Sequence, residues 1–265
     1  MSKPSLTESL MSDSQIDDLY KRTIRNGFLR LGGRGRLPRK TLSEWLSQDR
    51  LYAQAYARFI GGLISRLPLP TGGEADEPST TKTLEWRILV LLQKALEGII
   101  RELQLFEETA AKYNLDLNTP GVGEFRFGPN ATTQGYIQLL NSFAANAPAH
   151  PTRTLFDGLA VLWATEKVYL DSWTYAKEFQ GPVGSGGDQD GGAVREKFIP
   201  NWTSPEFQEF VKEAEECLDA YEQNLTGEEN EDARFVKAAE MLKKVLVLEE
   251  GFWPVTSDED DSTYF

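Results

Sequence analysis

The sequence is poor in the residues that bind metals and form covalent intermediates. Its 265 residues include one cysteine, Cys217, and one histidine, His150. A single cysteine excludes an internal disulfide and a cysteine-rich metal site. His150 stands before a proline and between expected helices, whereas a di-iron bundle needs paired Glu-x-x-His motifs and a helical haem pocket needs a histidine on a helix. We therefore expect neither a metal site nor a haem, and no catalytic triad built on histidine.

Positive charge and long apolar runs are also scarce. The chain has 28 Lys and Arg against 41 Asp and Glu, which gives a formal net charge of −13. Nucleic acids and anionic membranes are bound by clustered basic residues, so we expect neither as a partner. No apolar run approaches the roughly 18 residues of a membrane span, and the polar start lacks the apolar core of a secretory signal. These observations favour a cytoplasmic protein.

What the sequence does contain is apolar material with a helical period. Hydrophobic residues make up 40% of the chain, enough for a full core. They recur at intervals of three and four with no convincing strand pattern, which predicts a single all-α domain, a bundle of about seven helices. Capping-box patterns begin at Thr41 and at Thr154. The expected helices cover residues 15–31, 42–67, 84–114, 132–147, 154–179, a stretch from residue 203, and 230–250.

Composition divides the chain into a domain with two termini. We expect residues 1–12 to be a flexible N-terminus, 13–255 to form the helical domain, and 256–265 to be an acidic C-terminal tail. Within the domain, residues 68–82 and 180–200 are expected loops, because they are rich in proline or glycine. The glycines near residue 184 follow a helix and not a strand, so they are no dinucleotide-binding motif.

Three expected helices carry an acid where their apolar stripe should continue. Asp49, Glu166 and Glu249 each interrupt such a stripe, and Glu102 is a weaker case. An unpaired carboxylate in a core costs several kcal/mol, so it takes a proton or finds a partner. One interpretation is that these acids converge on a polar pocket inside the bundle. The other is that each is structural, bonded to a tyrosine, an arginine or a helix end.

A pocket of this kind suits acid–base chemistry on a small, flat, nitrogen-containing substrate. A desolvated glutamate has a raised pKa and acts as an acid or a base near neutrality. Carboxylates accept hydrogen bonds from ring amino groups, and aromatic side chains stack on ring faces. The candidate aromatic walls and hydroxyl donors are Tyr52, Tyr136, Tyr169 and Trp202.

Five segments, in order along the chain, resemble helices of the TenA family. Each segment is weakly specific alone, and the ordered set, within about residues 15–255, is more specific. They are WLSQDRLY at 45–52, RELQLF at 101–106, LWATEKVY at 162–169, WTSPEF at 202–207 and LEEGFW at 248–253.

The resemblance implies a fold and an activity. The family has the haem-oxygenase-like all-α fold without binding haem, and its members hydrolyse aminopyrimidine breakdown products in thiamin salvage without a metal or an organic cofactor. They release hydroxymethylpyrimidine and ammonia. One branch uses a cysteine on the central helix, where this sequence has Thr165 beside Glu166. The chain therefore resembles the branch that lacks the cysteine and hydrolyses aminomethyl- or formylaminomethyl-pyrimidines.

The resemblance also assigns roles to residues. Glu249 is the expected acid–base residue facing the leaving nitrogen, and Glu166 helps to activate water or to hold the substrate. Because the thiolate is missing, we expect direct attack by a carboxylate-activated water. Asp49 is expected to bind the pyrimidine ring. The other expected substrate contacts are Tyr52, Tyr136, Tyr169, Trp202 and Glu102.

Two other functions fit the same residues. The chain is a pyrimidine-binding protein without turnover if its acids only hold a ligand. It is a regulator or scaffold if they are purely structural, although its charge argues against direct DNA contact. By resemblance we also expect a homodimer or a homotetramer.

Overall fold

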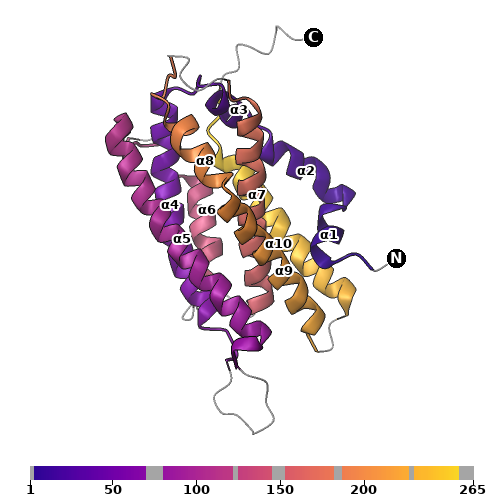
Figure 1. Ribbon diagram of the computed structural model, residues 1–265. Helices are drawn as coiled ribbons and strands as arrows, with labels where there is room; N and C mark the ends of the chain where they lie inside the picture. The colour runs from indigo at the N-terminus through magenta and orange to yellow at the C-terminus, as the bar shows by residue number, and fades with distance from the viewer. Residues whose placement is uncertain are drawn as a thin grey trace.

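The computed structural model describes residues 3–69, 80–121, 125–144, 153–181, 187–226 and 230–256. His150, residues 70–79, 182–186 and the tail from residue 257 lie outside this part, so the expectations placed on them stay open. All regular structure in the described part is helical, which confirms the all-α class (Figure 1). The helices are α1 (Leu6–Met11), α2 (Ser14–Ile24), α3 (Gly27–Gly33), α4 (Arg39–Ile64), α5 (Leu84–Tyr113), α6 (Ala131–Asn141), α7 (Leu155–Glu178), α8 (Ile199–Trp202), α9 (Pro205–Asn224) and α10 (Glu231–Phe252), with short helical turns at Thr80–Lys82 and Val194–Phe198.

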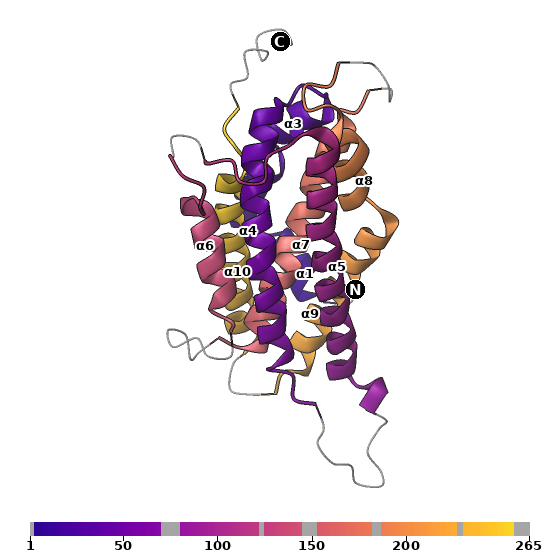
Figure 2. The same ribbon diagram turned by 90° about the vertical axis from the view of Figure 1, so that its left-hand side faces the viewer.

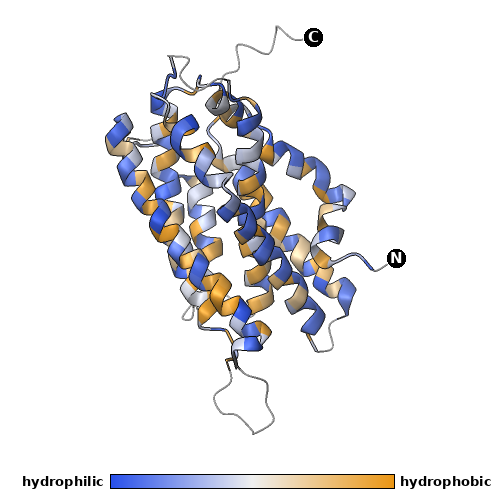
Figure 3. Cartoon of the chain, viewed as in Figure 1, coloured by the Kyte–Doolittle hydropathy of each residue, from blue (hydrophilic) through white to orange (hydrophobic). Residues whose placement is uncertain are grey.

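The long helices lie side by side as a bundle. Helix α4 packs between α5 and α6, and α7 packs against α9 and α10 (Figures 1 and 2). Hydrophobic residues recur along the whole length of these helices (Figure 3). Their inward stripes form a continuous core, because each helix buries its apolar face against its neighbours. Among the described residues we find no helix with the length and apolarity that a membrane span requires.

Helix α7 is the central element, and it begins where the sequence predicts, after Thr154. The Thr154 side chain accepts a hydrogen bond from the Asp157 backbone N–H, and Asp157 accepts one from the Thr154 backbone in return. This confirms the capping box. The box expected at Thr41 is wrong: α4 begins at Arg39 with Pro38 as its cap, so Thr41 is already inside the helix.

The N-terminal region differs from its prediction in two ways. Residues 1–12 were expected to be flexible, but Leu6–Met11 form α1, whose Thr7 bonds to Asp219 of α9 through its backbone N–H (3.0 Å) and its hydroxyl (2.8 Å). The helix expected over residues 15–31 is two helices. Its ladder breaks at Arg25, and Asn26 caps α3 by accepting a hydrogen bond from the Leu29 N–H.

The loop expected over residues 180–200 is partly helical. Val194–Phe198 form a wide turn of π-helix that runs directly into α8. Asp190, which is 1% exposed, holds the start of this turn because its two oxygens accept from Gly192 N–H (3.0 Å) and Val194 N–H (2.8 Å). The glycine-rich composition thus did not reveal a helical turn whose first N–H groups are bonded by the Asp190 side chain.

Candidate active site

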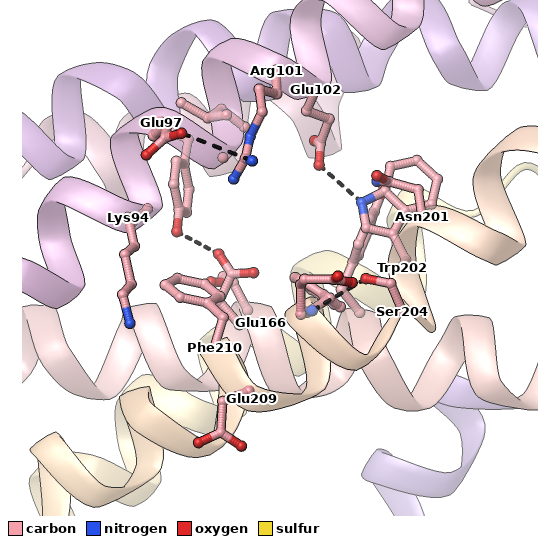
Figure 4. A pocket seen from close by; sticks show the side chains of 18 of the residues that line it. Lys94, Glu97, Arg101, Glu102, Glu166, Asn201, Trp202, Ser204, Glu209 and Phe210 are labelled. Atoms are coloured by element: carbon pink, nitrogen blue, oxygen red, sulfur yellow. Dashed lines mark hydrogen bonds and ion pairs between the residues drawn. The ribbon is translucent and has the colours of Figure 1, made fainter.

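A cavity of about 960 Å³ opens between α4, α5, α7, α8 and the first half of α9 (Figure 4). Five of the predicted site residues line it, and three do not. Asp49, Tyr136 and Glu249 are buried in a layer beside Tyr52 and Tyr169. The five on the wall are Tyr52, Glu102, Glu166, Tyr169 and Trp202.

Asp49 is held on α4 at the inner layer. It is 1% exposed, and its Oδ2 accepts a hydrogen bond of 2.8 Å from the Tyr169 hydroxyl. Its Oδ1 is buried and has no partner in the described part of the chain. Burial raises the pKa of Asp49 well above its usual range, and the nearby charges of Glu102 and Glu249 raise it further. The acids that interrupt the apolar stripes of separate helices are therefore close enough to shift the pKa of Asp49.

Glu249 on α10 has a matching arrangement. The Tyr136 hydroxyl of α6 donates a hydrogen bond to its Oε2, while Oε1 is buried without a described partner. Burial raises the pKa of Glu249 to about 7, although the bond from Tyr136 opposes the shift. The ring of Tyr136 meets that of Tyr52 edge-on, with centroids 5.0 Å apart. Tyr52, which is itself on the cavity wall, thus contacts the tyrosine that holds this carboxylate.

Glu166 and Glu102 present their carboxylates to the cavity from different helices (Figure 4). Glu166 on α7 accepts a hydrogen bond from the Tyr56 hydroxyl, and Glu102 on α5 accepts one of 2.8 Å from the Trp202 indole N–H. Burial raises the pKa of Glu166 to about 8 and that of Glu102 to about 7. At neutral pH these groups exchange protons readily, as an acid or a base must.

Two groups of residues were missed by the sequence analysis. Tyr56 continues an apolar stripe, and nothing in the sequence indicates that its hydroxyl bonds to Glu166 on α7. The second group is an aromatic cluster behind Trp202, whose indole stacks on Trp173 at 4.7 Å. Trp253 stacks on Tyr169 at 6.0 Å and on Trp45 at 6.0 Å. The cluster fixes the orientation of Trp202 and Tyr169 from behind.

The mouth of the cavity is acidic. Lys94 and Arg101 line it, and each lies at ion-pair distance from an acid, Glu213 at 2.6 Å and Glu97 at 3.8 Å respectively. The further wall acids Glu206 and Glu209 leave an excess of negative charge. Such a cavity favours a ligand that is cationic or rich in hydrogen-bond donors.

Neither candidate nucleophile is activated. The Thr165 hydroxyl lines the cavity but donates to its own helix, at the Leu162 carbonyl (2.9 Å) or the Val161 carbonyl (3.1 Å). Cys217 is buried on α9 and burial raises the pKa of its thiol. Within the described ranges, no His, Cys, Asp or Glu side chains form a group that is arranged to hold a metal ion.

The fold and the site define a class of protein: a helical bundle around a small-molecule pocket of carboxylates, tyrosines and tryptophans. Comparison with protein families identifies it further. Residues 14–259 match the TENA/THI-4/PQQC family, so the chain belongs to that family.

One curated relative aligns with most of the chain. A curated relative from Fusarium pseudograminearum (strain CS3096), named "Probable transcription factor", is 30% identical over 244 residues, which cover 82% of this chain and 45% of that protein. The chain thus spans about half the length of this relative.

Solved structures share the fold at low identity. A TenA homologue from Pyrococcus furiosus superposes with a TM-score of 0.69 at 22% identity, covering 94% of this chain and 98% of that one. A TenA family transcription regulator from a Silicibacter species gives 0.67 at 17% identity, covering 96% and 97%. A proposed TenA-like thiaminase from Sulfolobus solfataricus gives 0.60 at 15% identity, covering 93% of each chain. These likenesses show the fold.

Proposed function

We propose that this protein is a hydrolase of thiamin salvage that releases hydroxymethylpyrimidine from an aminomethyl- or formylaminomethyl-pyrimidine. The observation that carries the proposal is the cavity, whose wall combines aromatic rings with carboxylates of raised pKa and an acidic mouth. Family membership and the TenA-like thiaminase fold neighbour support the substrate class. Thr165 stands where one branch of the family has its cysteine, with Glu166 beside it, which supports the branch without a covalent intermediate.

In the proposed reaction Glu166 and Glu249 are the catalytic carboxylates. Water attacks the methylene carbon, the C–N bond breaks, and its electron pair leaves with the nitrogen. Asp49 has one oxygen without a described partner, which suits a hydrogen bond from the ring amino group. Trp202 and Tyr169, whose rings lie 5.0 Å apart, supply the aromatic wall of the pocket, with Tyr52 and Glu102 beside them and Tyr136 positioning Glu249.

The test is direct turnover. Purified protein is incubated with 4-amino-5-aminomethyl-2-methylpyrimidine or its N-formyl derivative, and the hydroxymethyl product and ammonia are followed by mass spectrometry and a coupled assay. We expect turnover of at least one substrate, and a loss of about 100-fold or more in kcat in Glu166→Gln and in Glu249→Gln. The matched control is Glu240→Gln, at an exposed position of α10. Absence of turnover of both substrates contradicts the proposal.

A second candidate is a pyrimidine-binding protein without turnover. It is favoured by the same cavity, whose carboxylates and aromatic rings can hold a ligand without turnover. The names of two similar proteins, a probable transcription factor and a TenA family transcription regulator, agree instead with the third function, a regulator. Calorimetry on the same two pyrimidines separates the candidates, because ligand binding without product identifies a binding protein. Absence of both binding and product leaves the third function, a regulator or scaffold. A homodimer or homotetramer remains part of the proposal, and light scattering tests it.

A further inference from the structure

The two carboxylates on the cavity wall have partners of different chemistry. Trp202 meets Glu102 with an indole N–H, which only donates, so Glu102 must present an acceptor oxygen to it. Tyr56 meets Glu166 with a hydroxyl, which both donates and accepts. The partner of Glu102 therefore favours the ionised carboxylate, whereas the partner of Glu166 suits either protonation state.

Each of these carboxylates also keeps one oxygen available. In the described part of the chain, the Trp202 bond is made to Oε2 of Glu102 and the Tyr56 bond to Oε1 of Glu166, and neither second oxygen has a hydrogen-bond partner there. By contrast, the unpartnered oxygens of Asp49 and Glu249 are buried in the inner layer. Of the four predicted acids, all of which lie in the described part of the chain, Glu102 and Glu166 are the two that combine a hydrogen-bonded oxygen with a place on the cavity wall.

We propose that Glu102 is a catalytic residue, the general base that takes the proton from the attacking water, and that Glu166 across the cavity is the acid that protonates the leaving nitrogen. The inference rests on the proposed function, changes the role of Glu102 from substrate contact to base, and moves the role of acid from Glu249, which does not line the cavity, to Glu166. The water oxygen bonds to the methylene carbon as its proton passes to Glu102. The C–N bond of the neutral amine or of the N-formyl derivative breaks, its electron pair goes to nitrogen, and Glu166 supplies the proton there, so that ammonia or formamide leaves. Solvent then restores both carboxylates.

The electrostatic surroundings agree with this assignment. Burial raises the pKa of both carboxyls, and a hydrogen bond opposes the shift in each, from Trp202 at Glu102 and from Tyr56 at Glu166. The pKa of Glu102 rises to about 7, and the charge of Glu102 raises the pKa of Glu166 further, to about 8. Between these values the base is mostly ionised and the acid mostly protonated, so activity should peak there. The titratable groups that act on Glu102 or feel its charge are Asp49 and Tyr56 on α4 and Glu166 and Tyr169 on α7.

The decisive experiment is the pH profile of kcat/KM in four variants. Glu102→Gln keeps an oxygen for Trp202 and should lose about 100-fold or more in activity together with the acidic limb of the profile. Trp202→Phe removes the donor, so the pKa of Glu102 should rise and the acidic limb should move to higher pH. Tyr56→Phe should instead move the alkaline limb to higher pH. The Tyr56 bond lowers the pKa of Glu166, so removing this bond should raise it. Glu107→Gln, at an exposed position of α5, is the control and should match wild type.

The outcomes separate this inference from the proposed function. Wild-type turnover with an acidic limb that survives in Glu102→Gln overturns the role of Glu102 and leaves the hydrolase standing. A fall in activity without any shift of a limb in Trp202→Phe identifies a structural role for the bond and also overturns it. If Trp202→Phe unfolds, the Glu102→Gln profile decides alone. Absence of wild-type turnover overturns both proposals.

Discussion

At the scale of single residues, the site contains carboxyl groups that remain partly protonated near neutral pH, because burial raises their pKa values. Glu249 is 5% exposed and its pKa is raised to about 7, against roughly 4.3 in an unfolded chain. Between these values the folded state binds more protons than the unfolded state. The contribution of Glu249 to the free energy of unfolding is therefore fully present below about pH 4 and is lost as the pH rises through about 7.

The residue-scale prediction concerns Glu249→Gln. The amide oxygen still accepts the hydrogen bond from Tyr136, but the titration is gone. The difference in the free energy of unfolding, variant minus wild type, should increase by about 1–3 kcal/mol when the pH is raised from about 5 to about 8.5. Urea denaturation at both pH values measures this, with the exposed Glu240→Gln as control. Parallel pH dependence in wild type and variant would show that Glu249 titrates normally.

How much of the site the sequence predicts also depends on single residues. Asp49, Glu166 and Glu249 are visible because a carboxylate in an apolar stripe conflicts with its surroundings. Tyr56 is invisible, because a tyrosine fits that stripe and its partner Glu166 lies 110 residues away. Nor does the sequence distinguish Glu102 on the cavity wall from Glu249 in the layer behind it, since helical period fixes a direction and not a depth.

At the scale of elements, periodicity predicts where helices lie better than where they start and stop. Apolar repeats located the long helices, but Asn26 divides one of them and Asp190 begins another inside a glycine-rich segment. Both boundaries depend on one side chain that caps a backbone group, a signal much weaker than a stripe of apolar residues.

The element-scale prediction concerns two adjacent glycines on α4. Gly62 faces the end of α6, where a Cβ would overlap the Phe143 carbonyl, whereas Gly61 has nothing within 4 Å. Gly62→Ala should lose about 1–3 kcal/mol in the free energy of unfolding, because the two backbones must separate. Gly61→Ala should gain about 0.5–1 kcal/mol, because alanine is the better helix former. Thermal unfolding of the pair measures both, and equal shifts would contradict the close approach.

At the scale of the whole molecule, the all-α class and the family follow from features that repeat along the chain. The segments that resemble the family follow in order within about residues 15–255, and the family match covers residues 14–259. The reaction does not follow in the same way, because it depends on which carboxylate faces the substrate. The net charge of −13 adds a property of the whole chain, since an acidic protein attracts a cationic ligand to its acidic cavity mouth.

The last prediction is that ligand binding stabilises the whole protein more at higher pH. The wall carboxylates Glu102 and Glu166, with pKa values of about 7 and about 8, are largely neutral at pH 6 and largely ionised above pH 8. An aminomethylpyrimidine carries an ammonium group, so its affinity should rise over this range. A ligand at 100 times its Kd stabilises the folded state by about 2.7 kcal/mol, which thermal unfolding detects. The shift in Tm at a fixed ligand concentration should therefore grow from pH 6 to pH 8, and the neutral N-formyl derivative should show a weaker trend. Equal trends for the two ligands would mean that the carboxylates do not recognise the ammonium charge.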